Sequence, residues 1–208
     1  MARHHRHIVG RVNQRVRLVL IGALALLFAG FAGAYLGASD RNLTPDPGAP
    51  FEGFVRPPGA TVPDFSLANQ DGERVARPDG APVIYAFIYS HCEDTCPFEL
   101  QQIRGAMDAL GRDVPVLGVS VDPANDTPAS ARAFMLKQHM TGRMDFLLGS
   151  REELAPVWKA FGIAPQTEGR EHSAGIVLAV DDQQRIGFPP GHLSTPALER
   201  DLRRLSRG

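Results

Sequence analysis

The sequence predicts an α/β domain whose β-sheet is covered by helices on both faces. Two continuous apolar runs, Pro82–Tyr89 and Val114–Val121, are rich in β-branched and aromatic residues, which is typical of buried strands. Segments with apolar residues at helical spacing follow these runs, and alternating strands and helices build layered sheets of this kind. Hydrophobic residues make up 43% of the chain and charged residues 22%, as in an ordinary globular protein.

The domain begins with a predicted β-hairpin. Its two strands, Asp64–Ala68 and Glu73–Ala76, flank an Asn-Gln-Asp-Gly turn. After the run Pro82–Tyr89 we expect a helix, whose apolar face comprises Leu100, Ile103, Met107 and Leu110. Gly111 is expected to end this helix, because glycine readily adopts the left-handed conformation found at helix C-termini.

Capping residues place the later helices. Thr127 and Pro128 suit the start of one helix, and Ser150 with Glu153 suits the capping box of the next. Because Pro156 lies late for that start, we expect the first turn of the second helix nearer to Ala155. The remaining predicted elements are strands at Phe146–Leu148, Ser173–Val180 and Arg185–Phe188, and a last helix that opens at Thr195 and Pro196.

The N-terminal part of the chain has a different composition. Residues 1–17 carry five arginines and no acidic residue, so we expect a basic cytoplasmic segment. Leu18–Ala38 contains no charged residue and no proline, and its 21 residues suffice to span a bilayer, which requires roughly 20. We therefore predict a single-pass anchor in a bacterial inner membrane, with the folded domain in the periplasm. A cleaved signal peptide is the alternative.

A proline- and glycine-rich linker is expected to follow the anchor. Residues 39–60 show no periodic apolar face, which is typical of a semi-extended tether. Residues 61–208 would then form the folded domain. The formal net charge of the chain is −1, so no overall positive charge indicates a nucleic-acid partner.

The chain has only two cysteines, Cys92 and Cys96, in the sequence His-Cys-Glu-Asp-Thr-Cys-Pro. A disulfide between them would close a very short loop and would stabilise the fold little, so we interpret the pair as reactive. The pair follows the first buried strand, where open α/β sheets place their sites, and Pro97 suits the start of a helix. A helix N-terminus favours the thiolate form of a nearby cysteine.

Two thiolates and one imidazole would form a trigonal site that suits Cu(I). The domain offers four histidines for the third position: His91, His139, His172 and His192. We favour His172, because it lies in a loop at the start of a predicted strand, where functional groups concentrate. His91 would point away from its neighbour Cys92, His139 suits a helix C-terminus, and the Pro-Pro-Gly-His loop suggests a solvated His192.

Three segments resemble the Sco/SenC family of copper chaperones. They are His-Cys-x3-Cys-Pro after a buried strand, Ser-Val-Asp-Pro-x-x-Asp-Thr-Pro at Ser120–Pro128, and Glu-His-Ser at Glu171–Ser173. The resemblance implies a thioredoxin-like fold, here with an added N-terminal hairpin, and copper bound by Cys92, Cys96 and His172. Glu171 departs from the aspartate usual in the family. Asp122 and Asp126, in the middle segment, we interpret mainly as loop formers.

The resemblance also implies partners. Family members deliver copper to the binuclear copper centre of cytochrome c oxidase, so we expect its copper-bearing subunit, or another cuproprotein, as acceptor, and a separate copper donor. Cu(I) is the expected ion, with Cu(II) also considered. We expect a metallochaperone rather than an enzyme. The main alternative is a thiol–disulfide oxidoreductase that acts on the cysteines of the acceptor through the same cysteine pair.

Overall fold

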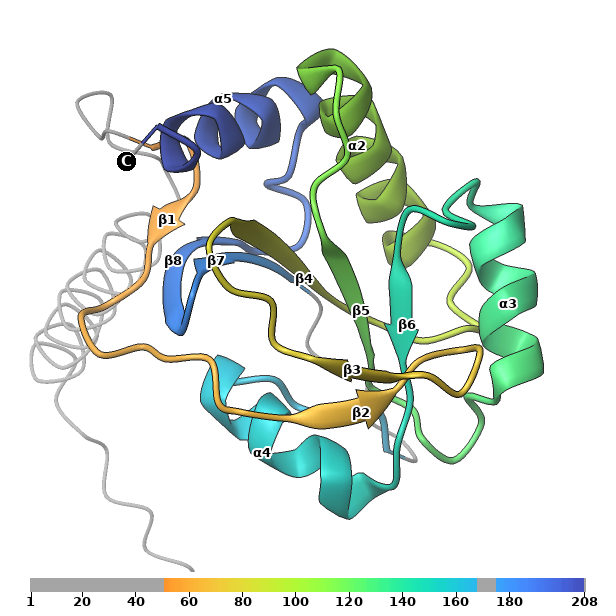
Figure 1. Ribbon diagram of the computed structural model, residues 1–208. Coiled ribbons are helices and arrows are strands. Elements are labelled where there is room, and N and C mark those ends of the chain that lie inside the picture. Colours follow the sequence, from red (N-terminus) through yellow and green to blue (C-terminus); the bar gives the residue numbers. More distant parts are fainter. Residues whose placement is uncertain (1–50, 168–174, 208) are drawn as a thin grey trace, which may run out of the picture. The chain divides into compact units, whose positions relative to one another are not determined.

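Six strands form one mixed sheet in the order β1-β8-β7-β4-β5-β6 in the computed structural model, which describes residues 51–167 and 175–207 (Figure 1). β4 pairs in parallel with β5, β5 pairs in parallel with β6, and the other three neighbouring pairs are antiparallel. The strands are β1 (Phe54–Val55), β4 (Pro82–Ile88), β5 (Val116–Ser120), β6 (Asp145–Leu147), β7 (Ile176–Val180) and β8 (Gln183–Phe188).

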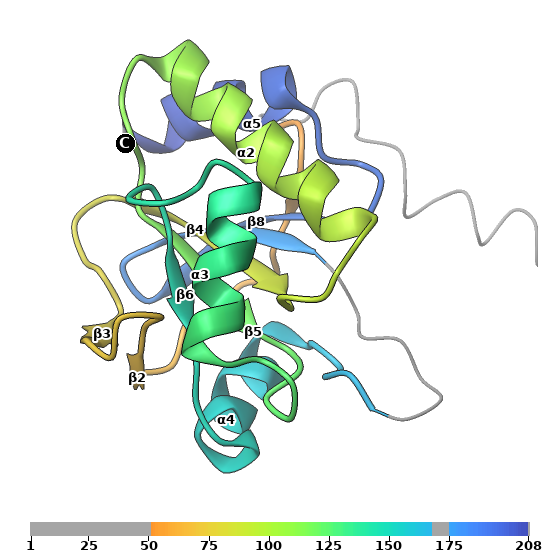
Figure 2. The ribbon, with the colours of Figure 1, turned by 90° about the vertical axis from the view of Figure 1, so that its right-hand side faces the viewer.

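The predicted hairpin is confirmed as a separate two-stranded sheet, formed by β2 (Ser66–Ala68) and β3 (Arg74–Ala76). Four helices complete the described domain: α2 (Thr95–Leu110), α3 (Pro128–Lys137), α4 (Arg151–Phe161) and α5 (Thr195–Leu205). Figure 2 shows α4 on the opposite side of the sheet from α2 and α5. The predicted two-sided covering of the sheet is therefore confirmed.

The central strand β4 explains this layering. Every residue of β4 is buried, and successive side chains point to opposite faces of the sheet. Ile84, Ala86 and Ile88 pack into one core cluster with apolar residues of α2, α3 and α5. Val83, Tyr85 and Phe87 pack into a second cluster with the apolar face of α4 and with Leu67 of the hairpin.

The predicted helix ends are largely confirmed. Gly111 ends α2 in the left-handed conformation, with φ of 70°. Thr127 caps α3 with Pro128 in its first position, and the Ser150–Glu153 capping box begins α4. The expectation that Pro156 would delay α4 is wrong, because this helix runs from Arg151 through the proline. Pro156 is exposed, so water can solvate the one carbonyl that loses its helical hydrogen bond.

The sheet begins earlier in the chain than the predicted boundary at Thr61. Phe54 and Val55 pair with Gly187 and Ile186 of β8, so part of the expected linker belongs to the sheet. The backbone N–H of Gly53 also donates to the buried carboxylate of Asp201, at 2.9 Å. A two-residue strand next to several prolines has no periodic pattern that sequence reasoning could detect.

The predicted basic segment 1–17, the anchor Leu18–Ala38 and residues 39–50 lie outside the described residues. Within residues 51–167 and 175–207, no helix is long and apolar enough to cross a membrane.

Candidate metal and thiol site

The two cysteines lie where the central strand passes into the first described helix. β4 ends at Ile88, the backbone N–H of Cys92 donates to the carbonyl of Tyr89 at 3.2 Å, and α2 begins at Thr95. This junction is at the carboxyl end of parallel strands, where α/β proteins place their sites. Pro97 lies in the first turn of α2, where its missing N–H leaves no helical hydrogen bond unmade.

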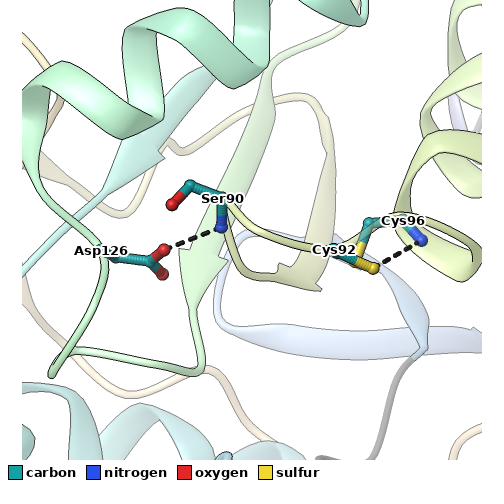
Figure 3. The surroundings of a disulfide bond; sticks show 4 residues. All are labelled: Ser90, Cys92, Cys96 and Asp126. Atoms are coloured by element: carbon teal, nitrogen blue, oxygen red, sulfur yellow. Dashed lines mark hydrogen bonds between the residues drawn. A yellow bond between two sulfur atoms is a disulfide. The ribbon is translucent and has the colours of Figure 1, made fainter.

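The sulfurs of Cys92 and Cys96 are joined in a disulfide, with Cα atoms 5.9 Å apart (Figure 3). The two sulfurs are not equivalent. The backbone N–H of Cys96 donates to the sulfur of Cys92, at 3.2 Å, and this interaction favours a thiolate there after reduction. Cys96 is fully buried, whereas Cys92 retains 7% exposure. Cys92 is therefore the sulfur that a reaction partner meets first.

A half-buried carboxylate, that of Asp126, holds the cysteine loop against the neighbouring loop. Asp126 accepts hydrogen bonds from the backbone N–H of Ser90, at 2.7 Å, and from the hydroxyl of Ser120, at 2.5 Å. Figure 3 shows the first of these bonds beside the cysteine pair. Burial raises the pKa of Asp126, and the hydrogen bonds from Ser120 and Ser90 partly oppose this shift. Asp126 therefore positions the loop that carries Cys92.

The interpretation of Asp122 and Asp126 as loop formers describes Asp122 better than Asp126. The carboxylate of Asp122 accepts from the side chain of Asn125 at 2.9 Å, within its own loop. Asp126 reaches across to a second loop, as its bond to Ser90 shows. The sequence signal for that contact was Ser90, a polar residue between a fully apolar strand and Cys92.

His172 and Glu171 lie outside the described residues, in the interval 168–174. The chain on either side of that interval is held at the carboxyl ends of β4 and β5. The backbone N–H of Gln166 donates to the carbonyl of Val121 at 2.8 Å, and the N–H of Phe87 donates to the carbonyl of Gly175 at 3.4 Å. The residues on both sides of the interval 168–174 therefore lie at the same edge of the sheet as Cys92.

No group of three histidine, cysteine or acidic side chains suited to a metal ion occurs within the described residues. The cysteine pair alone supplies two soft donors, which is the donor chemistry that copper in its reduced state selects. His91 is exposed and its ring lies 3.1 Å from the hydroxyl of Ser90. The ring of His192 contacts Phe54 edge to face, and His139 follows the C-terminal end of α3.

One buried group near the pair was missed by sequence reasoning. Glu99 is 1% exposed, and neither carboxyl oxygen has a hydrogen-bond partner among the described residues. Burial raises the pKa of Glu99 to about 7. Its sequence signal was an acidic residue one turn after Cys96, on a helix face otherwise formed by apolar side chains such as Leu100 and Ile103.

The fold and the cysteine pair define a class of protein, the thioredoxin-like domains with a dithiol at the start of the helix that follows the central strand. The chain belongs to the SCO1/SenC family, whose family model matches residues 55–207. The predicted family and thioredoxin-like fold are thus confirmed.

Named relatives agree with this assignment. The mitochondrial SCO1 homolog 1 of Arabidopsis thaliana is 33% identical over 119 residues, which are 54% of this chain and 35% of that protein. The chain spans about a third to a half of the length of the mitochondrial relatives from Arabidopsis, human and cattle.

Two solved structures are similar to the domain. Copper-bound ScoI of Arabidopsis thaliana is 25% identical, with a TM-score of 0.59, and the match covers 70% of this chain and 98% of that one. Copper-bound ScoI of Bradyrhizobium japonicum is 29% identical, with a TM-score of 0.57 and coverages of 69% and 98%.

Proposed function

We propose that this protein is a membrane-anchored copper chaperone. It binds one Cu(I) through Cys92, Cys96 and His172 and passes the ion to the copper-bearing subunit of cytochrome c oxidase or to another cuproprotein. The single observation that carries the proposal is the pair of adjacent sulfurs at the carboxyl edge of the sheet, beside the two chain ends that flank His172.

The donor set suits the reduced ion. Two thiolates select soft metals, and an imidazole serves copper as a further ligand. The N–H of Cys96 supports negative charge on the sulfur of Cys92, which metal binding requires. Copper is here the cargo of the protein, so its site must release the ion as well as hold it.

Chain length supports His172 as the third ligand. His172 lies three positions before Gly175, whose carbonyl accepts a hydrogen bond from the N–H of Phe87 near the end of β4. At about 3.3–3.6 Å per residue, the Cα atom of His172 is then within roughly 11 Å of Gly175. Cys92 lies four positions after the end of the same strand, so a link of this length supports His172 as a ligand at the edge of the domain that carries the sulfurs.

The copper-bound ScoI structures from two organisms support copper as the ion, because this chain shares their fold and their family. We propose the cellular arrangement from the sequence: a cytoplasmic segment 1–17, an anchor at residues 18–38, a tether and a periplasmic domain.

A second function is favoured by one observation, the disulfide between Cys92 and Cys96. A pair that alternates between disulfide and dithiol can reduce or oxidise the cysteines of an acceptor by thiol–disulfide exchange. This activity uses Cys92 and Cys96 and makes no use of His172. The effect of replacing His172 on copper binding therefore distinguishes the two functions.

The test is a copper titration of the reduced full-length protein under anaerobic conditions. We expect one copper ion per chain, and loss of binding in Cys92→Ala, Cys96→Ala and His172→Ala. His192→Ala is the matched control and should bind copper normally. If His172→Ala binds copper as the unmodified chain does and keeps disulfide exchange, while Cys92→Ala and Cys96→Ala lose that exchange, the oxidoreductase function is the better account.

A further inference from the structure

A groove of about 760 Å³ lies between helix α3, the hairpin of β2 and β3, and the beginning of the edge strand β6. Figure 1 shows the helix and the hairpin beside this strand. Residues 114–117, before and at the beginning of β5, also line the groove. It therefore lies at the amino ends of the parallel strands, whereas the cysteine pair follows their carboxyl ends, so an occupant would leave the sulfurs free.

Apolar side chains form much of the groove. Leu117 and Met135 are buried, Val75 is half-buried, and all three line it. Leu136, which also lines the groove, is 70% exposed and is the most exposed large apolar side chain in residues 51–167 and 175–207. A single exposed leucine is ordinary on a protein surface, but one that borders a cavity of this size can bury its surface against an occupant.

Two carboxylates in the groove have no basic partner among the described residues. Glu73 and Asp145 each accept a hydrogen bond from the side-chain nitrogen of Asn69, at 3.3 and 2.9 Å. Asn69 is 3% exposed, and its side-chain oxygen accepts from the N–H groups of Asp71 and Glu73. The hairpin therefore holds the two carboxylates close together, where their like charges repel each other.

The two arginines that line the groove do not neutralise this pair of carboxylates. Arg143 is bonded to Asp113 at 2.8 Å and to Asp108 at 2.9 Å. Arg132 lies 3.6 Å from Asp71. Each guanidinium group is thus matched by another acidic side chain. A cation that enters the groove would relieve the repulsion, and an ammonium or guanidinium group has enough donors to bond to both carboxylates.

The edge strand itself offers little backbone to a partner at the groove. The N–H of Phe146 donates to the side-chain oxygen of Gln70 at 2.8 Å, and the N–H of Leu148 donates to the carbonyl of Ala68 at 2.7 Å. A partner cannot add a strand through N–H groups that are already bonded. Recognition at this groove therefore depends on side chains.

We infer that the groove binds an extended segment of a partner protein, with an apolar side chain against Leu136 and a lysine or arginine between Glu73 and Asp145. The unmatched negative charge selects the basic residue, and the exposed leucine selects the apolar one. Residues two positions apart in an extended segment point to the same side, so both can enter the groove. Because exposed charge pairs contribute little affinity, binding is weak and depends on salt.

The test is fluorescence anisotropy of a labelled octapeptide titrated with the full-length protein in detergent. The peptide carries one arginine, with leucines two positions before and after it. We expect saturable binding that weakens as salt is added, and binding at least about tenfold weaker when glutamate replaces the arginine. Leu136→Ala should weaken binding about fivefold, and the double variant of Glu73→Gln with Asp145→Asn at least about fivefold.

Two matched controls change exposed residues of the same kinds outside the groove. Glu93→Gln removes a carboxylate from the cysteine loop, and Phe98→Ala removes an apolar side chain that is 45% exposed. Both should bind the peptide as the unmodified chain does. The absence of saturable binding, equal affinity for the arginine and glutamate peptides, or a loss in Phe98→Ala in place of Leu136→Ala would overturn the inference.

A second copy of the chain is the competing occupant. It would appear in sedimentation as a dimer that Leu136→Ala dissociates, and that result would also overturn the inference. Copper binding by Leu136→Ala and Glu73→Gln should equal that of the unmodified chain, because the groove lies away from the cysteine pair. The copper titration and the peptide titration can therefore fail independently of each other.

Discussion

The substitution Glu99→Gln gives a quantitative test of the burial of this carboxyl. Glutamine keeps the shape of the side chain but cannot ionise. In the folded chain the pKa of Glu99 is raised from 4.5 to about 7, so the folded state holds a proton that the unfolded state has already released. Each pKa unit is worth about 1.4 kcal/mol, so the raised pKa corresponds to about 3 kcal/mol.

The direction of the pH dependence follows from the number of protons that the folded and unfolded states bind. The stabilising effect of the neutral carboxyl is fully present below the unfolded pKa near 4.5, and it is lost as pH rises through about 7. The stability of Glu99→Gln relative to the unmodified chain should therefore rise by about 3 kcal/mol between roughly pH 4 and pH 8. Asp126 and Asp201 also have raised pKa values, but they occur in both proteins, so their contributions cancel.

The assay is urea denaturation of both proteins, with the disulfide intact, at several pH values across this range. The quantity compared is the unfolding free energy of Glu99→Gln minus that of the unmodified chain at each pH. A difference that stays constant from acid to alkaline pH would refute the claim that Glu99 is buried in neutral form. A difference that falls with rising pH would contradict the predicted rise in the relative stability of Glu99→Gln.

Two other predictions concern the cysteine loop. Asp126→Ala leaves the N–H of Ser90 and the hydroxyl of Ser120 without their acceptor, so we expect a loss of about 1–3 kcal/mol in urea denaturation and weaker copper binding. Asp126→Asn, which keeps one acceptor oxygen, should lose less, and an equal loss would contradict this assignment. In the reduced chain, iodoacetamide should modify Cys92 before Cys96, because Cys92 is less buried and its thiolate accepts a hydrogen bond. Peptide mass spectrometry measures which cysteine is modified first, and earlier modification of Cys96 would contradict the claim that Cys92 is the more accessible and more reactive sulfur.

Much of the fold could be predicted from local pattern. β4 is an unbroken apolar run, so its position between two layers follows from its sequence. Thr127 and Ser150 cap their helices through side-chain hydrogen bonds that depend only on residues three positions away. Such elements are determined by contacts within one turn of the chain, which is why sequence reasoning located them.

The errors arose where distant contacts decide the structure. Phe54 and Val55 are strand residues only because β8, more than 100 positions later, supplies their partners. Pro156 is tolerated because the helix around it buries Leu154 and Val157 against the sheet, which outweighs one lost hydrogen bond. The role of Asp126 likewise depends on Ser90, which lies 36 positions earlier.

The candidate site likewise has residues that the sequence predicted and residues that it did not. The cysteine pair could be placed from its spacing and its position after β4, and the structure brings the two sulfurs together. His172 was selected by its place before a strand, and it remains a predicted ligand. Glu99 was missed, because its importance comes from burial between elements and not from the motif around Cys96.

X-ray absorption spectroscopy of copper in the reduced, Cu(I)-loaded full-length protein tests the central claim most directly, because it counts the atoms bound to the metal. The account predicts two sulfur neighbours and one nitrogen neighbour, with the nitrogen lost in His172→Ala. A copper ion surrounded only by nitrogen and oxygen, or a spectrum that His172→Ala leaves unchanged, would contradict it.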